Sequence, residues 1–356
     1  MTDVLFEQVG RLGLITLNRP AQLNALTHEM ALRIEERLLH WRDERAVAAV
    51  TIIGAGPRAF CAGGDVRAVW EEAHADPARL GPRNWQFYAD EYRLNTLIKR
   101  YPKPYVALMD GVVMGGGVGL SLHGSHRIAG DATLFAMPET AIGLFPDVGA
   151  TFFLPRLPGG TGMWLGLTGA RLKAADCVAA GLCDLFAPSA REGALIAALG
   201  EAEFDGQPAA AVDAVLDRFR ADPGPAALPG LRPAIDRCFA GPTLEAVLAA
   251  LDAEPGDWAA EQAAALRRKS PTSLRLTFRA LRLGRTMAFE DCMRMEYQLA
   301  RFCMTHPDFY EGVRSVIIDK DHAPTWRPAT LAEADEASVA AAFAPLAPGE
   351  ALALGR

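Results

Sequence analysis

The sequence predicts an α/β protein, in which a mixed core over residues 1–190 precedes a helical region over residues 191–356. In the first part, short apolar runs typical of strands alternate with longer stretches of helical periodicity. Glycine-rich turns follow several of the apolar runs. In the second part, the chain is rich in alanine and keeps helical periodicity. Alternating strands and helices followed by helices alone favour this fold class.

The predicted strands are apolar runs bounded by turn-forming residues. They cover residues 4–9, 12–17, 46–53 and 105–109. The first two form a hairpin, because only Gly10 and Arg11 separate them. A helix is predicted over residues 27–45, where Thr27 is the N-cap and apolar residues recur at helical spacing. Residues 84–100 predict a second helix.

Prolines mark the predicted turns of the helical region up to residue 264. They are Pro208, Pro223, Pro225, Pro229 and Pro242. Ser270 and Pro271 then predict the start of a further helix, as an N-cap followed by a proline in the first turn.

The composition excludes several classes of protein. Half of the 356 residues are hydrophobic and 22% are charged, so a sizeable core is expected. The formal net charge is −7 and the basic residues are scattered, so we expect no nucleic-acid partner. No apolar run reaches the roughly 18 residues that a membrane span needs, and residues 1–18 resemble neither a signal peptide nor a transit peptide. We therefore expect a cytoplasmic protein that does not bind membranes.

The cysteines and histidines predict neither disulfides nor a metal site. The six cysteines include no C-x-x-C pair, so buried reduced thiols are expected. His123 and His126 lie three residues apart, but no ligand set at a standard spacing accompanies them.

Two glycine-rich segments each lead from a predicted strand into a predicted helix. They read AFCAGGD at residues 59–65 and DGVVMGGGVGL at residues 110–120. Glycine lets the backbone approach a ligand closely, and the first turn of a helix has unpaired N–H groups. One N–H from each segment could hold an oxyanion, each worth about 3 kcal/mol in a transition state. Tight turns alone would also explain the glycines.

Glu139 and Asp147 interrupt an otherwise apolar stretch over residues 132–149. Burial disfavours a charged carboxylate and raises its pKa, which suits an acid or a base in catalysis. Each residue also has a simpler explanation. Glu139 follows Pro138 and could begin a helix, and Asp147 lies in a turn signature.

Other chemistries do not match the residues. A dinucleotide-binding G-x-G-x-x-G beginning at Gly115 would need glycine at position 120, which is leucine, and no G-x-x-x-x-G-K-[ST] exists. Ser121 lacks the second glycine of a nucleophile elbow and falls inside a predicted helix.

Four segments in order resemble the crotonase, or enoyl-CoA hydratase/isomerase, superfamily. They are NRPAQLNAL at 18–26, AFCAGGD at 59–65, DGVVMGGGVGL at 110–120 and MPETAIGLFPDVGA at 137–150. Residues 308–328 are similar to the branch that hydrolyses 3-hydroxyisobutyryl-CoA in valine degradation. The resemblance implies a crotonase-like spiral of ββα repeats, with an acyl-CoA-binding catalytic core over residues 1–190. The helical region over residues 191–356 would complete the site or form a homo-oligomer.

The resemblance also implies a role for each matching residue. Gly64 and Gly116 correspond to oxyanion-hole donors, Glu139 to the catalytic glutamate, and Asp147 to the acid of the hydrolase branch. Residues implied in substrate binding are Asn24, Ala25, Leu26, Ala62 and Glu91. No cofactor is implied, because CoA is part of the substrate.

Gly119 departs from the hydratase pattern of this superfamily, in which a second catalytic glutamate occupies this position. Hydrolysis of a short branched hydroxyacyl-CoA is therefore favoured over hydration or isomerisation of an enoyl-CoA. Glu139 would either attack the thioester carbonyl or activate water for that attack. A non-catalytic acyl-CoA-binding protein is a further alternative.

Overall fold

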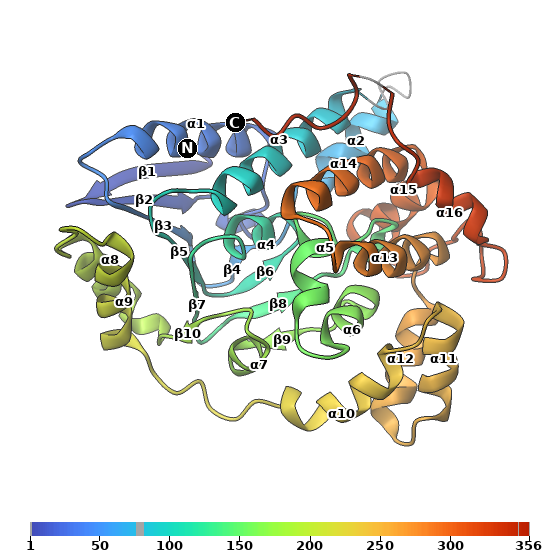
Figure 1. The fold of residues 1–356 in the computed structure, drawn as a ribbon. Helices are drawn as coiled ribbons and strands as arrows, with labels where there is room; N and C mark the ends of the chain where they lie inside the picture. The colour runs from blue at the N-terminus through green and yellow to red at the C-terminus, as the bar shows by residue number, and fades with distance from the viewer. Residues whose placement is uncertain (1, 76–81, 348, 356) are drawn as a thin grey trace. The chain divides into compact units, whose positions relative to one another are not determined.

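The computed structural model describes residues 2–75, 82–347 and 349–355, and confirms an α/β fold (Figure 1). The chain forms two compact units, each built from three segments. Unit 1 comprises residues 1–64, 93–135 and 172–228. Unit 2 comprises residues 65–92, 136–171 and 229–356. Each unit therefore combines residues that are far apart in the sequence.

Unit 1 contains a six-stranded sheet in the order β1-β2-β3-β5-β7-β10. Its strands are β1 Val4–Val9, β2 Leu12–Leu17, β3 Ala49–Gly54, β5 Tyr105–Met109, β7 His126–Ala129 and β10 Leu185–Phe186. The predicted hairpin is confirmed, since β1 pairs antiparallel to β2 with Val4 opposite Leu17. The other neighbours in this sheet pair in parallel.

A second sheet has the order β4-β6-β8-β9. Its strands are β4 Ala59–Cys61, β6 Val112–Met114, β8 Leu134–Ala136 and β9 Leu172–Lys173. β4 and β6 are parallel neighbours, with Ala59 opposite Val112 and Cys61 opposite Val113. This pairing sets the two glycine-rich segments next to each other, because each of them follows one of these strands.

The first predicted helix is α1, His28–Asp43. The hydroxyl of Thr27 accepts a hydrogen bond from the N–H of Met30 at 3.2 Å, so the predicted N-cap is confirmed. At the other end of α1, the Lys103 amine donates to the carbonyl oxygen of Trp41 in the last turn and to that of the C-cap residue Glu44, the latter at 2.7 Å. A cation at the end of a helix stabilises its unpaired carbonyl groups.

One face of the large sheet packs against α8, Glu192–Gly200, and α9, Pro208–Phe219. These helices appear in yellow-green in Figure 1. The buried apolar side chains of this core come from both layers; among them are Leu12, Val106, Ile128, Leu195, Leu199, Val212 and Phe219. The further helices of unit 1 are α4 Gly116–Ser121 and α7 Ala174–Ala180.

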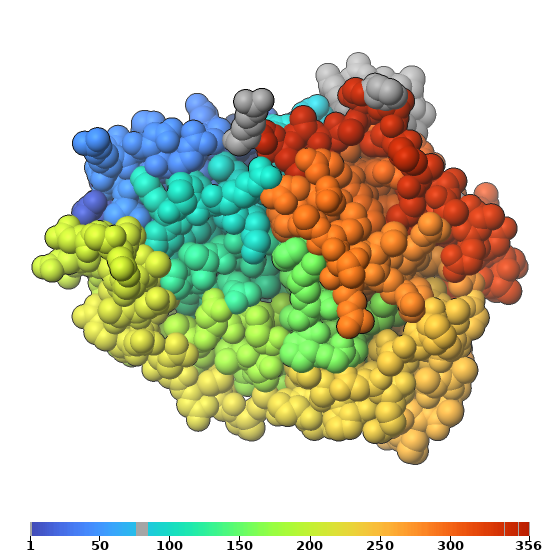
Figure 2. All heavy atoms as spheres, in the orientation of Figure 1, coloured from blue at the N-terminus to red at the C-terminus, as the bar shows by residue number. Residues whose placement is uncertain are grey.

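Unit 2 is mostly helical. Its helices include α2 Val66–Ala75, α5 Ala150–Phe153, α6 Thr161–Thr168, α11 Leu244–Ala253, α12 Asp257–Arg267, α13 Pro271–Gly284, α14 Phe289–Thr305, α15 Pro307–Val313 and α16 Glu336–Ala342. Helix α3, Pro82–Lys99, belongs to unit 2 up to Tyr92. Helices α11 and α12 pack against each other, and Figure 2 shows their light-orange atoms as a continuous surface. The Ser270 hydroxyl accepts from the N–H of Ser273, which confirms this predicted helix start.

Two of the five predicted proline turns are wrong. Pro208 is the first residue of α9, and Pro229 is the second residue of α10, Leu228–Phe239. A proline in the first turn of a helix loses no hydrogen bond, because the N–H groups of that turn have no intrahelical acceptor.

All six cysteines are buried and unbridged, as predicted. Among the described residues, no helix combines the length and the apolar character that a membrane span requires.

Candidate active site

The turn after β4 is held by the loop at residues 18–26. The N–H of Leu26 donates to the carbonyl of Gly63 at 2.8 Å, and the N–H of Ala62 donates to the carbonyl of Leu23 at 3.0 Å. These bonds place Leu26 beside Gly64 in a parallel bridge. In the described part of the chain, the N–H of Gly64 has no backbone acceptor. It is therefore available to a ligand.

Asn24 holds this loop with its side chain. Its Nδ2 donates to the carbonyls of Ala55 at 3.0 Å and Ala59 at 2.8 Å, and its Oδ1 accepts from the N–H of Arg19 at 2.9 Å. Arg19 in turn donates to the carbonyl of Ala25 at 2.7 Å. The predicted substrate-binding loop is thus fixed both within itself and to residues 55–59, and the polar atoms of the Asn24 side chain are used in these hydrogen bonds.

The second glycine turn begins α4. Gly115 has a φ of +46°, which favours glycine, and Gly116 is the first residue of the helix. The N–H of Gly116 has no intrahelical acceptor at this position. A Cβ on Gly117 would lie 2.2 Å from the carbonyl oxygen of Cys61, and a Cβ on Gly63 would lie 4.0 Å from the nitrogen of Gly116. Unit 1 therefore brings the two predicted oxyanion-hole turns into backbone contact.

Three predicted carboxylates lie in unit 2, and each exposes at most 4% of its surface. Glu139 begins a 3₁₀ turn over Glu139–Ile142, Asp147 precedes α5, and Glu91 lies on α3. Burial raises the pKa of Glu139 and of Glu91 well above the usual range, and the charge of Asp147 raises both further. These interactions bring the three acids into one electrostatic cluster.

Asp147 has the least perturbed pKa of the three. Burial raises its pKa to about 6, and a hydrogen bond from the Tyr92 hydroxyl to Oδ2 at 2.7 Å opposes that rise. A donor to the ionised form stabilises the charge. The hydrogen bond from Tyr92 therefore favours the ionised form of Asp147.

Three buried polar atoms in this cluster lack a hydrogen-bond partner within the described residues. They are Oε1 of Glu91, Oε2 of Glu139 and the hydroxyl of Tyr88. Tyr88, Glu91 and Tyr92 are spaced so that all three lie on one face of α3. Buried polar groups are nearly always paired in native proteins, so these three atoms are free to bind a polar ligand or an ordered water molecule.

Two charged residues of this region were not predicted. Glu296 on α14 is fully buried, and both of its oxygens accept hydrogen bonds from residues near Asp147. Burial lowers the pKa of the Lys269 amine to about 8, while the charge of Glu139 opposes this fall. Glu296 has a detectable signal in the sequence, because it interrupts the apolar stripe of α14 that contains Cys292, Met293 and Ala300.

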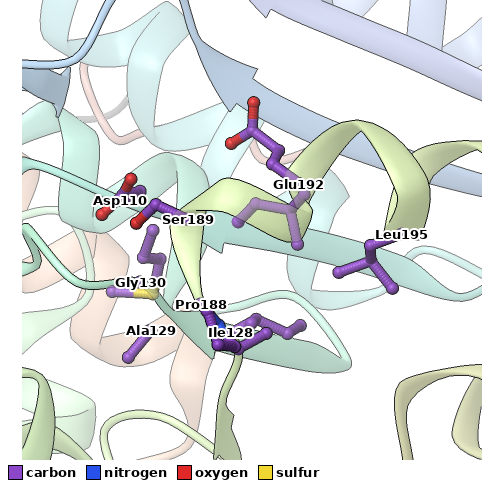
Figure 3. Close-up of a pocket in the computed structure, with 11 residues that line it drawn as sticks. Asp110, Ile128, Ala129, Gly130, Pro188, Ser189, Glu192 and Leu195 are labelled. Atoms are coloured by element: carbon purple, nitrogen blue, oxygen red, sulfur yellow. The ribbon is translucent and has the colours of Figure 1, made fainter. Parts of the chain in front are cut away.

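Two further features of the chain do not form a substrate site. Within the described ranges, no group of three or more His, Cys, Asp or Glu residues could hold a metal ion. A cavity of about 20 Å³ in unit 1 is lined by Asp110, Ser189, Glu192 and mainly apolar neighbours (Figure 3). That volume holds about one water molecule, so it is too small for a substrate.

Comparison with known proteins points to one family. A family model described as "Enoyl-CoA hydratase/isomerase" matches residues 12–343. The chain is 45% identical to the 3-hydroxyisobutyryl-CoA hydrolase, mitochondrial, of Danio rerio, over 97% of this chain and 90% of that protein. It is 41% identical to the Homo sapiens protein of the same name, over 94% of this chain and 86% of that protein.

Solved structures give the same fold under different names. A carnitinyl-CoA dehydratase from Mycobacterium thermoresistibile has a TM-score of 0.90 and 41% identity, and the match covers 99% of each chain. An enoyl-CoA hydratase from Rhodobacter sphaeroides 2.4.1 has a TM-score of 0.89 and 42% identity, covering 99% of this chain and 100% of that chain. The crotonase fold is thereby confirmed, and the choice between hydrolysis and hydration rests on the site residues and the curated relatives.

Proposed function

Because this chain belongs to the enoyl-CoA hydratase/isomerase family, we propose that it hydrolyses 3-hydroxyisobutyryl-CoA to 3-hydroxyisobutyrate and free CoA. The curated relatives named for this reaction match nearly the whole chain. The observation that supports it best is the buried cluster of Glu91, Glu139 and Asp147, in which two carboxylates have an unpaired oxygen. Such a cluster suits an acyl group that has a hydroxyl.

In the proposed reaction, the N–H groups of Gly64 and Gly116 stabilise the negative charge that forms on the thioester oxygen. Glu139 acts by one of two routes. It adds to the carbonyl carbon and forms an anhydride that water then cleaves, or it takes a proton from the attacking water. In both routes the carbon–sulfur bond breaks and CoA leaves as a thiolate, with a thiol pKa of about 8.5 by analogy with cysteine.

We assign recognition of the acyl group to Glu91 and Asp147. The unpaired Oε1 of Glu91 would accept a hydrogen bond from the 3-hydroxyl, and the ionised Asp147 would orient that hydroxyl or the attacking water. A substrate without the 3-hydroxyl would leave this buried acceptor unpaired. We therefore expect such a substrate to be hydrolysed more slowly by a large factor.

Hydration of an enoyl-CoA is the second candidate, because the two structural neighbours are named for hydratase or dehydratase reactions. That chemistry uses two carboxylates to place water and move the α-proton. Residue 119 is a buried glycine of α4, so this helix offers no carboxylate at the position where the resemblance implies one for hydratases. Hydrolysis is favoured for this reason.

The purified protein is expected to release a thiol rapidly from 3-hydroxyisobutyryl-CoA and to leave the absorbance of crotonyl-CoA almost unchanged. Both substrates should be followed at the same enzyme concentration, with isobutyryl-CoA as the matched substrate without a hydroxyl. Loss of enoyl absorbance without thiol release would contradict hydrolysis. Binding of both substrates without turnover of either would indicate a non-catalytic protein.

Tyr92→Phe is expected to move upward, by about one pH unit, the part of the acid limb of the kcat/KM profile that reports protonation of Asp147. The hydrogen bond from Tyr92 lowers the pKa of Asp147, so its loss lets Asp147 take up a proton at higher pH. Activity that needs the ionised carboxylate then falls earlier as the pH decreases. Tyr101→Phe is the control, since its hydroxyl donates to the carbonyl of Leu38 in unit 1. An unchanged acid limb in Tyr92→Phe would contradict the role of Asp147.

The location of the protein stays a prediction. The animal relatives described above are named as mitochondrial, whereas the sequence predicts a cytoplasmic protein. Fractionation of the native cells, with antibody detection, would decide between a membrane-bound compartment and the cytoplasm. Size-exclusion chromatography would test the predicted homo-oligomer.

A further inference from the structure

The turn that carries Asp147 has an uncommon backbone conformation. Val148 has a φ of +51° and Gly149 a φ of +87°, so two successive residues lie in the left-handed region. Glycine adopts this region freely, but a β-branched residue such as valine does so only under strain. Strained backbone persists where the surrounding structure fixes it, and such positions cluster at functional sites.

Glu296 supplies the contacts that fix this turn. Its Oε2 accepts a hydrogen bond from the N–H of Gly149 at 2.6 Å. Its Oε1 accepts from the N–H of Thr151 at 2.9 Å and from the Thr151 hydroxyl at 2.6 Å. The side chain comes from α14 and is fully buried, and Glu296 is 145 residues from Thr151 and 147 from Gly149 in the sequence. All three hydrogen bonds bind the segment directly after Asp147.

We propose that Glu296 is a positioning residue that holds the Val148–Gly149 turn in its strained conformation and thereby presents the Asp147 carboxylate to the acyl group. This proposal rests on the function proposed above for Asp147. Glu296 itself need not touch the substrate, because its two oxygens are already occupied by three donors. Tyr92 fixes the side chain of Asp147, whereas Glu296 fixes the backbone of Gly149 and Thr151, which follow Asp147 in the chain.

A carboxylate suits this task better than an amide. In the structure all three groups that face Glu296 donate to it, and these hydrogen bonds oppose the effect of burial, which raises the pKa of Glu296 to about 8. In glutamine, one oxygen becomes an NH₂ donor, which would face either the N–H of Gly149 or the N–H of Thr151, and neither of these N–H groups can accept a hydrogen bond. Glu296→Gln therefore keeps the volume of the side chain and removes part of the hydrogen bonding.

Valine at position 148 offers a direct test, because glycine there would adopt the same turn without strain. Glu296→Gln is expected to lower kcat for 3-hydroxyisobutyryl-CoA by about 30-fold with little change in KM, in line with the loss of hydrogen bonds from a buried carboxylate. Adding Val148→Gly is expected to restore at least a third of that loss on a logarithmic scale. Coupling of this kind between neighbouring residues is what a double-mutant cycle measures. Asp291→Asn, at an exposed ion pair with Arg294 on the same helix, is the control with unchanged kcat.

A readout without substrate separates this proposal from the proposed function. Amide hydrogen exchange at Gly149 and Thr151 is expected to be faster in Glu296→Gln and to slow again with Val148→Gly. If the wild-type protein releases no thiol but exchange follows this pattern, the proposed function fails and the positioning role holds. A kcat in folded Glu296→Gln equal to that of the wild type overturns the proposal. If Glu296→Gln does not fold, Thr151→Val can be used instead, because it removes only the hydroxyl donor. Unchanged exchange at Gly149 together with an unchanged kcat in Thr151→Val would also overturn the proposal.

Discussion

Glu139→Gln is expected to lower kcat for thioester hydrolysis by about 1,000-fold or more, with KM changed by less than about threefold. The amide can neither attack the carbonyl carbon nor take a proton from water, so both proposed routes stop at the same step. Binding is retained, since glutamine has the same volume and an oxygen at an equivalent position. Burial and the charge of Asp147 raise the pKa of Glu139, and a higher pKa makes it a stronger base once ionised.

Stability provides the check on this first prediction. Glu139→Gln removes an acid that is buried beside Asp147 and has an unpaired oxygen, so the variant is expected to unfold at the same temperature or higher. Thermal unfolding and thiol release should be measured on the same preparation. Glu261→Gln, an exposed residue of α12, is the matched control with unchanged kcat. A folded Glu139→Gln variant that keeps more than a tenth of the wild-type kcat would contradict the proposed mechanism.

The two routes differ in the fate of oxygen from water. After a single turnover in isotopically labelled water, label in the carboxylate of Glu139 requires a covalent intermediate. Label in the released acid alone is expected when water attacks the thioester directly. Mass spectrometry of the peptide that contains Glu139 distinguishes these results.

Gly117→Ala is expected to lower kcat by about 100-fold or more and to destabilise the fold by about 3 kcal/mol. The new Cβ would lie 2.2 Å from the carbonyl oxygen of Cys61 and 2.8 Å from its Cβ, so the backbone must move. This backbone movement separates the turn of Gly64 from that of Gly116. The N–H groups of these two proposed donors then no longer point at the same oxygen atom. An oxyanion hole depends on such fixed geometry.

Gly193→Ala is the control for this second prediction. Gly193 lies in α8, its φ is not positive, and a Cβ there would meet no atom within 4 Å. Alanine in a helix is favoured over glycine, so this variant should be at least as stable as the wild type and fully active. A Gly117→Ala variant that unfolds at the wild-type temperature and keeps the wild-type kcat would contradict both the packing and the assigned donors.

Elements set by local sequence could be predicted well. The hairpin of β1 and β2, the helix α1 and the caps at Thr27 and Ser270 all follow from neighbouring residues, and the structure confirms them. The proline turns failed at Pro208 and Pro229 because the same residue begins a helix as readily as it ends one.

The residues that the sequence did not single out are those defined by distant contacts. Tyr92 meets Asp147 across 55 positions, and Glu296 meets Gly149 across 147. Their periodicity places them on buried helix faces, but it cannot state which polar group they will meet there. Glu139 and Asp147 could be singled out because each interrupts an apolar run in its own segment.

The burial of all six cysteines has a consequence for the chemistry of the product. The proposed reaction liberates a thiol, which can form mixed disulfides with accessible protein thiolates in an oxidising environment. Burial raises the pKa of Cys292 to about 11 and raises that of Cys303 further, so these side chains stay protonated and shielded. Buried cysteines of this kind are protected from forming mixed disulfides with the released CoA. A thiol-reactive dye added to the folded protein would therefore report released CoA with little background from the protein.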